Sequence, residues 1–197
     1  SNLRNSAICD LYKELVSINT TKVDKVKLTV YYETLCPASI SFIVEQLRPA
    51  VSRLDSHLDT SVFEGRYTFS CQHGPRECYY NKVHACAIDV LHNNTHAILF
   101  NSCIMQYISY SSDYKHFVSV VQFENVHTYD IWTCMNSTRG SELLKAYGDE
   151  NNLLDPPYVP YLLLDGSTEG QDRAASNLFE VVCQKLTTKP TVCSGYY

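Results

Sequence analysis

The chain of 197 residues lacks the features that would direct it to a nucleic acid or into a membrane. It contains no run of lysine and arginine, and its formal net charge is −5. Without a basic patch, a surface for nucleic acid or anionic lipid is not expected. No apolar stretch approaches the roughly 18–20 residues of a membrane-spanning helix. We therefore expect no nucleic-acid partner and no membrane span, and the sequence carries no signal for an oligomeric state.

The chain also lacks the common fingerprints of catalysis and cofactor binding. It has no G-x-S-x-G, P-loop, H-E-x-x-H or dinucleotide-binding glycine pattern, and no internal repeat or low-complexity segment. We therefore expect no cofactor. With 45% hydrophobic residues, a chain of this length can bury the core of one domain.

Cysteine, in contrast, is abundant. The nine residues are Cys9, Cys36, Cys71, Cys78, Cys86, Cys103, Cys134, Cys183 and Cys193. Three N-x-Ser/Thr sequons, at Asn19, Asn93 and Asn136, accompany them. Dense cysteine together with several sequons predicts a disulfide-bonded glycoprotein of the secretory pathway, either secreted or lysosomal.

The odd number of cysteines leaves one thiol over. If that thiol is Cys36, the other eight cysteines can form four disulfides. The alternatives are an unpaired thiol elsewhere in the chain, or a cysteine that pairs between two chains. We expect Cys9 to join an N-terminal extension, residues 1–25, to the rest of the protein.

Residues 26–47 predict a strand, a tight turn with one cysteine, and a helix. Apolar residues alternate with polar ones up to Tyr32, as in a half-buried or central strand, and apolar residues then recur at helical spacing from about Ser39. Cys36 therefore stands at a helix N-terminus, where unpaired backbone N–H groups and the helix dipole favour the thiolate. Pro37 suits the first helical turn, where its missing N–H has no partner.

This strand–Cys-Pro-x-(Cys/Ser)–helix unit is typical of the reactive corner of a thioredoxin-like fold, but its fourth position is Ser39. Serine cannot close a disulfide, so dithiol reduction by this corner alone is excluded, whereas exchange through the single thiol of Cys36 is not. Ser39 has three interpretations: an N-terminal cap of the helix, which we favour, a hydrogen-bond donor to the thiolate, or a substitution introduced to trap a covalent complex.

Residues 71–86 carry the most specific pattern in the chain. Its fixed positions are Cys71, Gln72, His73, Gly74, Glu77, Cys78, Asn81 and Cys86. They match C-Q-H-G-x-x-E-C-x-x-N-x-x-x-x-C, the signature of the gamma-interferon-inducible lysosomal thiol reductase (GILT) family, which the chain resembles over about residues 26–197.

The same stretch permits a zinc interpretation, through Cys71, His73, Cys78, His84 and Cys86. The cysteine spacings of seven and eight are unlike the short arms of structural zinc sites, and the expected compartment is oxidising. We therefore expect disulfides here and no metal.

The resemblance implies an α/β, disulfide-stapled thioredoxin-like fold, a single domain over 26–197 with a helical insertion, or lid, at about 71–155. It implies a cis Pro160 that faces Cys36, with Val159 offering backbone groups to a substrate strand. Cys183 and Cys193 stand where the family has them, and we expect them to pair. The chain departs from the pattern at Ser39, a replacement that occurs among invertebrate members, and between Val62 and Phe63, where the family usually has a longer segment.

The resemblance also implies a function. The family acts on protein disulfides at acidic pH, so the substrate would be a disulfide-containing protein and Cys36 the nucleophile. Because of Ser39, we expect classical dithiol reduction to be weak or lost. The alternative is a non-catalytic glycoprotein on the same scaffold that binds or regulates an extracellular protein.

The remaining elements follow from local pattern. We expect a kink near residues 46–48, because Pro49 interrupts a helix. The other predicted elements are helices over 77–110, with a break at 92–95, and over 113–124, 128–135, 140–147 and 174–186, and a strand over 161–164 closed by the turn Asp165–Gly166. Ser141 and Gly148 are taken as the start and end signals of the helix over 140–147.

Overall fold

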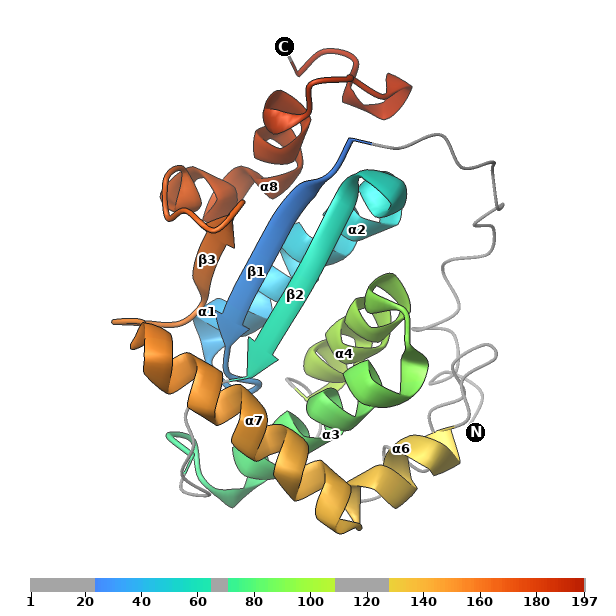
Figure 1. The fold of residues 1–197 in the computed structure, drawn as a ribbon, viewed down its shortest axis with the longest axis vertical. Helices are drawn as coiled ribbons and strands as arrows, with labels where there is room; N and C mark the ends of the chain where they lie inside the picture. The colour runs from blue at the N-terminus through green and yellow to red at the C-terminus, as the bar shows by residue number, and fades with distance from the viewer. Residues whose placement is uncertain (1–23, 65–70, 109–127, 197) are drawn as a thin grey trace.

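The computed structural model describes residues 24–64, 71–108 and 128–196 (Figure 1). Three strands form one sheet and helices surround it, so the described part of the chain is mixed α/β. Figure 1 shows one group of helices against the sheet and a second group, lower in the view, past one end of the strands. None of the described helices is long and apolar enough to cross a membrane.

The sheet has the strand order β2-β1-β3. Strand β1 (Val26–Tyr32) lies in the middle, parallel to β2 (Leu58–Glu64) and antiparallel to β3 (Tyr161–Leu164). Every residue of β1 from Leu28 onward is buried. Of the two predictions for this strand, half-buried or central, the structure confirms the central one.

Strand β2 runs without interruption through the point where the family pattern has a longer segment. Val62 pairs with Val30, and the next residue, Phe63, pairs with Tyr31. The parallel pairing is therefore complete without that segment.

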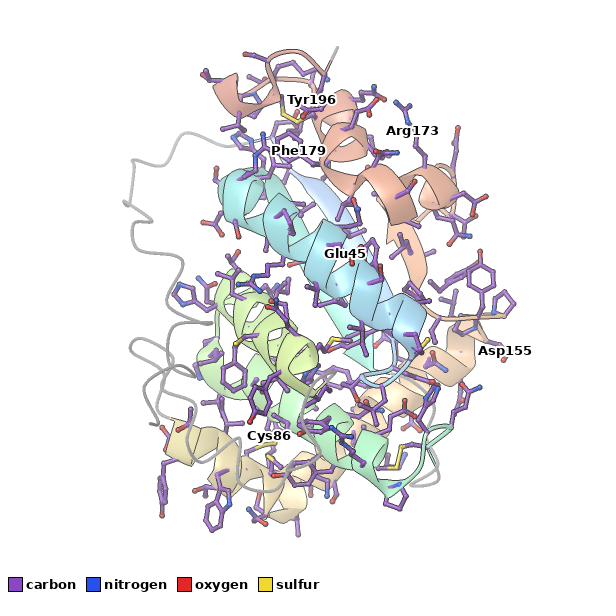
Figure 2. The ribbon with its side chains drawn as sticks, turned by 180° about the vertical axis from the view of Figure 1, so that it is seen from behind. Glu45, Cys86, Asp155, Arg173, Phe179 and Tyr196 are labelled. Carbon is purple, nitrogen blue, oxygen red and sulfur yellow. A yellow bond between two sulfur atoms is a disulfide. The ribbon has the colours of Figure 1, made fainter. Side chains whose placement is uncertain are left out.

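Parallel strands need a crossover, and a long helical segment supplies it. It comprises α1 (Pro37–Ser41), the π-helical stretch η1 (Phe42–Leu47), α2 (Arg48–Leu54) and the 3-10 turn η2 (Asp55–His57). Figure 2 shows it covering the back of the sheet. The expected kink takes the form of the wider π turns before Pro49, where Arg48 N donates to Ile43 O, five residues back.

Four described helices lie between β2 and β3 in the sequence, and we call them the helical unit. They are α3 (Pro75–Leu91), α4 (Asn94–Ile108), α6 (Thr128–Met135) and α7 (Thr138–Leu154). The predicted break at 92–95 and the predicted helix over 128–135 are confirmed. The helix predicted over 113–124 lies outside the described residues, as do Cys9 and the extension up to residue 23.

The bounds predicted for the helix over 140–147 are wrong. Helix α7 begins after Ser137, whose Oγ accepts from Arg139 N at 3.2 Å, so Ser141 is not its cap. It continues through Gly148, which is buried, and ends where Asp155 adopts the left-handed conformation. Two prolines then prevent its continuation. Gly148 has a weak helix propensity, but it lies on the buried side of α7, and its burial outweighs that propensity.

The C-terminal segment follows its sequence pattern. Asp165 and Gly166, both at positive φ, form the predicted turn after β3. Helix α8 (Gln171–Lys185) and the 3-10 turn η3 (Thr191–Cys193) come next, and the expected Cys183–Cys193 disulfide joins them.

Two buried apolar clusters hold these elements together. The first lies between the sheet and the helices α1 to α2 and α8, and we call these elements the sheet unit. The second lies within the helical unit, where the Cys86–Cys134 disulfide joins α3 to α6 (Figure 2). Helix α4 contributes residues to both clusters. The turn between β1 and α1, which carries Cys36, lies where the sheet unit meets α3.

Candidate active site

Cys36 lies at the junction of β1 and α1 and is the free cysteine of the described residues. It is half-buried and occupies the N-cap position of α1, and its carbonyl accepts from Ile40 N at 2.9 Å. Pro37 is in the first helical turn, as predicted. No side chain caps this helix start. The thiol therefore stands beside backbone N–H groups that have no partner within the helix.

The thiol of Cys36 faces a segment 123 residues further along the chain. Its Sγ donates to Val159 O at 3.8 Å, and the Val159–Pro160 peptide bond is cis. The structure thus places Cys36 against the predicted proline loop and confirms the predicted cis geometry.

Ser39 is fully buried and is the third residue of α1, so the prediction that it caps the helix is wrong. The helix starts earlier because Pro37 already has the φ of a first helical residue. The Ser39 hydroxyl instead accepts from Glu33 N at 3.4 Å. Among the described hydrogen bonds, none joins Ser39 to the Cys36 thiol.

Disulfides occupy the cysteines of the signature. Cys71 pairs with Cys78, and Cys86 pairs with Cys134. Cys103 is also disulfide-bonded. The cysteines of the zinc interpretation are therefore engaged in disulfides, as expected.

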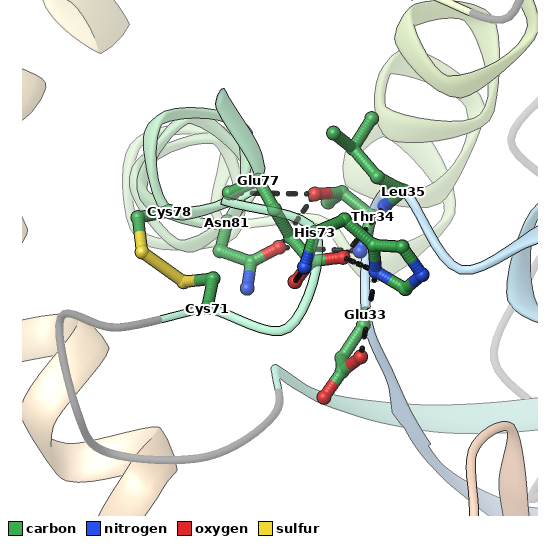
Figure 3. Close-up of a disulfide and its surroundings, with 8 residues drawn as sticks. All are labelled: Glu33, Thr34, Leu35, Cys71, His73, Glu77, Cys78 and Asn81. Atoms are coloured by element: carbon green, nitrogen blue, oxygen red, sulfur yellow. Dashed lines mark hydrogen bonds and ion pairs between the residues drawn. A yellow bond between two sulfur atoms is a disulfide. The ribbon is translucent and has the colours of Figure 1, made fainter. Parts of the chain in front are cut away.

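The loop closed by the Cys71–Cys78 disulfide is also held by hydrogen bonds between His73 and Glu77. His73 folds back on Glu77, its backbone N donating to Oε1 at 3.1 Å and its Nδ1 donating to Oε2 at 2.6 Å (Figure 3). Gly74, at φ 85°, provides the turn into α3 in a conformation that L side chains rarely adopt. Gln72, the remaining loop residue of the signature, is exposed.

The buried signature residues Glu77 and Asn81 face the turn before Cys36 (Figure 3). Glu77 Oε2 accepts from Leu35 N at 3.3 Å. Asn81 Oδ1 accepts from Thr34 N at 3.2 Å and from Thr34 Oγ1 at 2.6 Å. Sequence reasoning did not identify Thr34, and the only available signal was the i, i+4 spacing of the two signature residues.

A histidine outside the signature extends the same helix face. His84 is fully buried, and its Nδ1 shares a hydrogen bond of 2.7 Å with Tyr32 OH. Burial lowers the pKa of His84 to about 3, so the imidazole is neutral over the physiological range. Sequence reasoning considered His84 only as a zinc ligand and missed this contact.

One group of described residues has its ligand atoms close enough to share a metal ion: Glu33, His73 and Glu77, within 4.8 Å of one another. Both oxygens of Glu77 already accept hydrogen bonds from His73, and one of them also accepts from Leu35. Glu33 Oε2 lies 4.0 Å from His73 Nδ1. Hydrogen bonding therefore accounts for the contact between His73 and Glu77 without an ion.

Two of the three sequons lie in described positions, and both asparagines are exposed. Asn93 precedes α4, where its Oδ1 accepts from His96 N at 2.9 Å. Asn136 follows α6, and its Nδ2 donates to Trp132 O at 2.8 Å. Asn19 lies outside the described residues.

Solved structures with a similar fold include a DsbA oxidoreductase and a putative protein disulfide isomerase. Reduced DsbA1 from Neisseria meningitidis covers 84% of this chain and 88% of its own, with a TM-score of 0.52 and 12% sequence identity. A putative protein disulfide isomerase from Nitrosomonas europaea covers 74% and 87%, with a TM-score of 0.50 and 7% identity. At such identities the likeness shows the fold alone, which is the predicted thioredoxin-like one.

Sequence relatives are more informative. Residues 27–138 match the sequence model of the family "Gamma interferon inducible lysosomal thiol reductase (GILT)". GILT-like protein 1 of Drosophila melanogaster is 33% identical, over 97% of this chain and 87% of its own length. The gamma-interferon-inducible lysosomal thiol reductase of Mus musculus is 30% identical, over 86% and 72%. The chain therefore belongs to the GILT family.

Proposed function

We propose that this protein is a thiol–disulfide exchange protein that works through the single thiol of Cys36. The observation that supports it most is the position of that thiol. It is free, it stands at the start of α1, and it lies against the Val159–Pro160 loop, while the other described cysteines are in disulfides. Family membership supports reaction with disulfides of proteins.

The reaction needs an external reductant, because Ser39 cannot resolve an intermediate. The Cys36 thiolate attacks one sulfur of a substrate disulfide, forms a mixed disulfide and releases the other substrate sulfur as a thiolate, which takes up a proton. A small thiol then attacks the Cys36 sulfur and releases the second substrate thiol. A second molecule of small thiol regenerates Cys36. The sum is one substrate disulfide and two small thiols converted into a dithiol and one small-molecule disulfide.

The backbone at Val159 is suited to a substrate strand. In the resting protein, Val159 O accepts from the Cys36 thiol. When that thiol has reacted, the carbonyl is available to a substrate N–H, so the mixed disulfide and a backbone hydrogen bond form side by side. Pro160 has no N–H of its own and therefore leaves this edge open to a substrate chain.

Ser39 acts on this reaction through the turn. Its hydroxyl holds Glu33 N, three residues before the nucleophile, and so supports the path of the chain into Cys36. It does not supply a second sulfur, so turnover is slower than in a dithiol reductase, and the mixed disulfide persists until a small thiol arrives.

We place this reaction in the secretory pathway, in a secreted or lysosomal protein. Three disulfides among the described residues fit an oxidising compartment. The exposed sequons Asn93 and Asn136 are accessible for N-glycosylation.

A disulfide-reduction assay tests the proposal. A fluorogenic protein disulfide is followed at about pH 5 and about pH 7 with excess small thiol, for the unmodified chain, Cys36→Ser and Ser39→Cys. We expect slow turnover by the unmodified chain, none by Cys36→Ser, and faster turnover by Ser39→Cys. Equal rates for the unmodified chain and Cys36→Ser would refute the exchange function. Rapid turnover by the unmodified chain, abolished in Cys36→Ser, would instead contradict the expectation that reductase activity is weak or lost.

A further inference from the structure

Three buried polar side chains lie along one face of α3, and we call them the α3 stripe. Glu77, Asn81 and His84 follow one another at i, i+4 and i+7, and their exposed fractions are 0%, 3% and 0%. Burying such groups is unfavourable unless each finds a hydrogen-bond partner. The partner of His84 is Tyr32, the last residue of β1.

The other partners of the α3 stripe are the next residues along the chain. Asn81 accepts from the backbone N and the hydroxyl of Thr34, and Glu77 accepts from Leu35 N. Along the chain from β1 toward Cys36, Tyr32, Thr34 and Leu35 bond in turn to His84, Asn81 and Glu77. The order of the partners on α3 is therefore the reverse of the order in the turn. The stripe therefore follows the turn 33–36 itself, and not only the strand before it (Figure 3).

The backbone N–H groups of this turn all have partners. Glu33 N donates to Ser39 Oγ, and Cys36 N donates to Glu33 O at 3.3 Å. The two N–H groups between them, those of Thr34 and Leu35, donate to α3. Two of the four backbone N–H groups of the turn thus find their acceptors in the helical unit.

The loop before α3 orients the carboxylate that the turn uses. The Cys71–Cys78 disulfide and the turn at Gly74 bring His73 back over α3, where its N and Nδ1 both donate to Glu77. These two hydrogen bonds from His73 orient the Glu77 carboxylate, so that its Oε2 also accepts from Leu35 N. This arrangement uses six of the signature residues: Cys71, His73, Gly74, Glu77, Cys78 and Asn81.

We propose that Glu77 and Asn81 are positioning residues, which hold the turn 33–36 so that the Cys36 sulfur stands in line with a substrate disulfide beside Val159. The proposal rests on the proposed function, since exchange is its principal readout. Sulfur-for-sulfur displacement requires the attacking atom to lie on the axis of the bond that breaks. A small alkylating reagent imposes a much weaker demand, because it approaches the thiol from any open side.

The test compares two substitutions at one position. Asn81→Leu removes the acceptor of Thr34, whereas Asn81→Asp keeps an oxygen in its place. Per folded molecule, we expect Asn81→Leu to slow exchange with a fluorogenic disulfide by at least about tenfold and to change the alkylation rate of Cys36 by less than about threefold. Asn81→Asp restores most of the exchange rate. Asn101→Leu, a buried asparagine on α4 without a hydrogen bond to the turn, is the matched control and keeps the rate of the unmodified chain.

A second, milder pair protects the test against misfolding. Thr34→Val removes only the hydroxyl, which donates to Asn81 Oδ1 at 2.6 Å and to Glu77 O at 3.4 Å, while Thr34→Ser retains it. We expect a several-fold loss of exchange for Thr34→Val and none for Thr34→Ser. Amide hydrogen exchange at Thr34 and Leu35 is measured on every folded variant, and we expect protection at Thr34 to fall in Asn81→Leu and to return in Asn81→Asp.

Each outcome decides something different. Normal exchange in folded Asn81→Leu and Thr34→Val would overturn the positioning role while leaving the proposed function intact. Exchange and alkylation that fall together, without rescue by Asn81→Asp, would show a merely structural role and also overturn it. Absence of exchange in the unmodified chain would overturn the proposed function, and the amide protection of Thr34 would then decide whether α3 still anchors the turn.

Discussion

The sheet unit and the helical unit meet at Cys36, and they are built in different ways. The cluster of the sheet unit consists of apolar side chains and the Cys183–Cys193 disulfide. The described polar side chains buried in the strands and α1 of the sheet unit are the small hydroxyl residues Thr29, Ser39 and Thr60, whereas the helical unit buries an acid, an amide and an imidazole along one helix. Close packing of apolar side chains fixes how the elements fit together. A buried polar group, in contrast, fixes the orientation of the group it bonds, because a hydrogen bond needs its partner at a given place. We therefore expect substitutions in the sheet unit to change stability and those in the α3 stripe to change reactivity.

The largest effect on stability should come from the disulfide of the helical unit. Cys86–Cys134 closes 48 residues and Cys183–Cys193 closes 10. Because the entropy removed from the unfolded chain grows with loop length, Cys86→Ala/Cys134→Ala should cost about 4 kcal/mol and Cys183→Ala/Cys193→Ala about 3 kcal/mol. Urea unfolding of the two double variants measures both costs. Equal costs would indicate that loop length does not set the difference between the units.

A core substitution should separate stability from reactivity. Leu28, fully buried in β1, belongs to the cluster of the sheet unit. Leu28→Ala should lower the free energy of unfolding by about 3 kcal/mol, through lost burial and the cavity that remains. Per folded molecule its disulfide exchange should match the unmodified chain, unlike that of Asn81→Leu. A comparable loss of exchange in both variants would contradict the division between the two units.

Acid should weaken the helical unit through His84. Its pKa falls from 6.5 to about 3 on folding, because burial excludes the charged form. Between these values the unfolded state binds more protons, so His84 contributes to stability above about pH 6.5 and that contribution declines as pH falls toward 3. From pH 7 to pH 5 the expected loss is about 2 kcal/mol.

Urea unfolding across this pH range tests the contribution of His84. His84→Phe should be less stable at pH 7, because the hydrogen bond between Tyr32 and His84 is lost, but its stability should decline less on acidification. The NMR signals of the His84 ring should show no titration between about pH 7 and pH 5 in the folded chain. A titration midpoint near 6 would contradict the neutral, buried imidazole.

The parts of this site that sequence could predict are the local ones. The strand β1 and the placement of Pro37 depend on neighbours in the chain, and both are confirmed. The cis geometry of Pro160 followed from the family resemblance and not from composition. The hydrogen bonds from Thr34 to Asn81 and from Leu35 to Glu77 join residues 47 and 42 positions apart, and no local pattern encodes such contacts.

Two local signals were wrong where tertiary structure decided the outcome. Gly148 is predicted as the end of a helix, yet α7 continues through it in a buried position. Ser39 reads as a cap, yet the helix starts at Pro37 and the hydroxyl holds the turn instead.

The smallest predicted effect compares the helix starts of the two units. Helix α7 is capped by the Ser137 hydroxyl, whereas α1 begins at Cys36 with no side-chain cap. Ser137→Ala should therefore cost about 1 kcal/mol, and Cys36→Ser should gain about 0.5 kcal/mol, since serine is a good N-cap residue. Thermal unfolding measures both shifts. A stabilised but inactive Cys36→Ser variant would indicate that a thiol occupies this position for its chemistry at some cost in stability, whereas a destabilised variant would show that the thiol itself supports the start of α1.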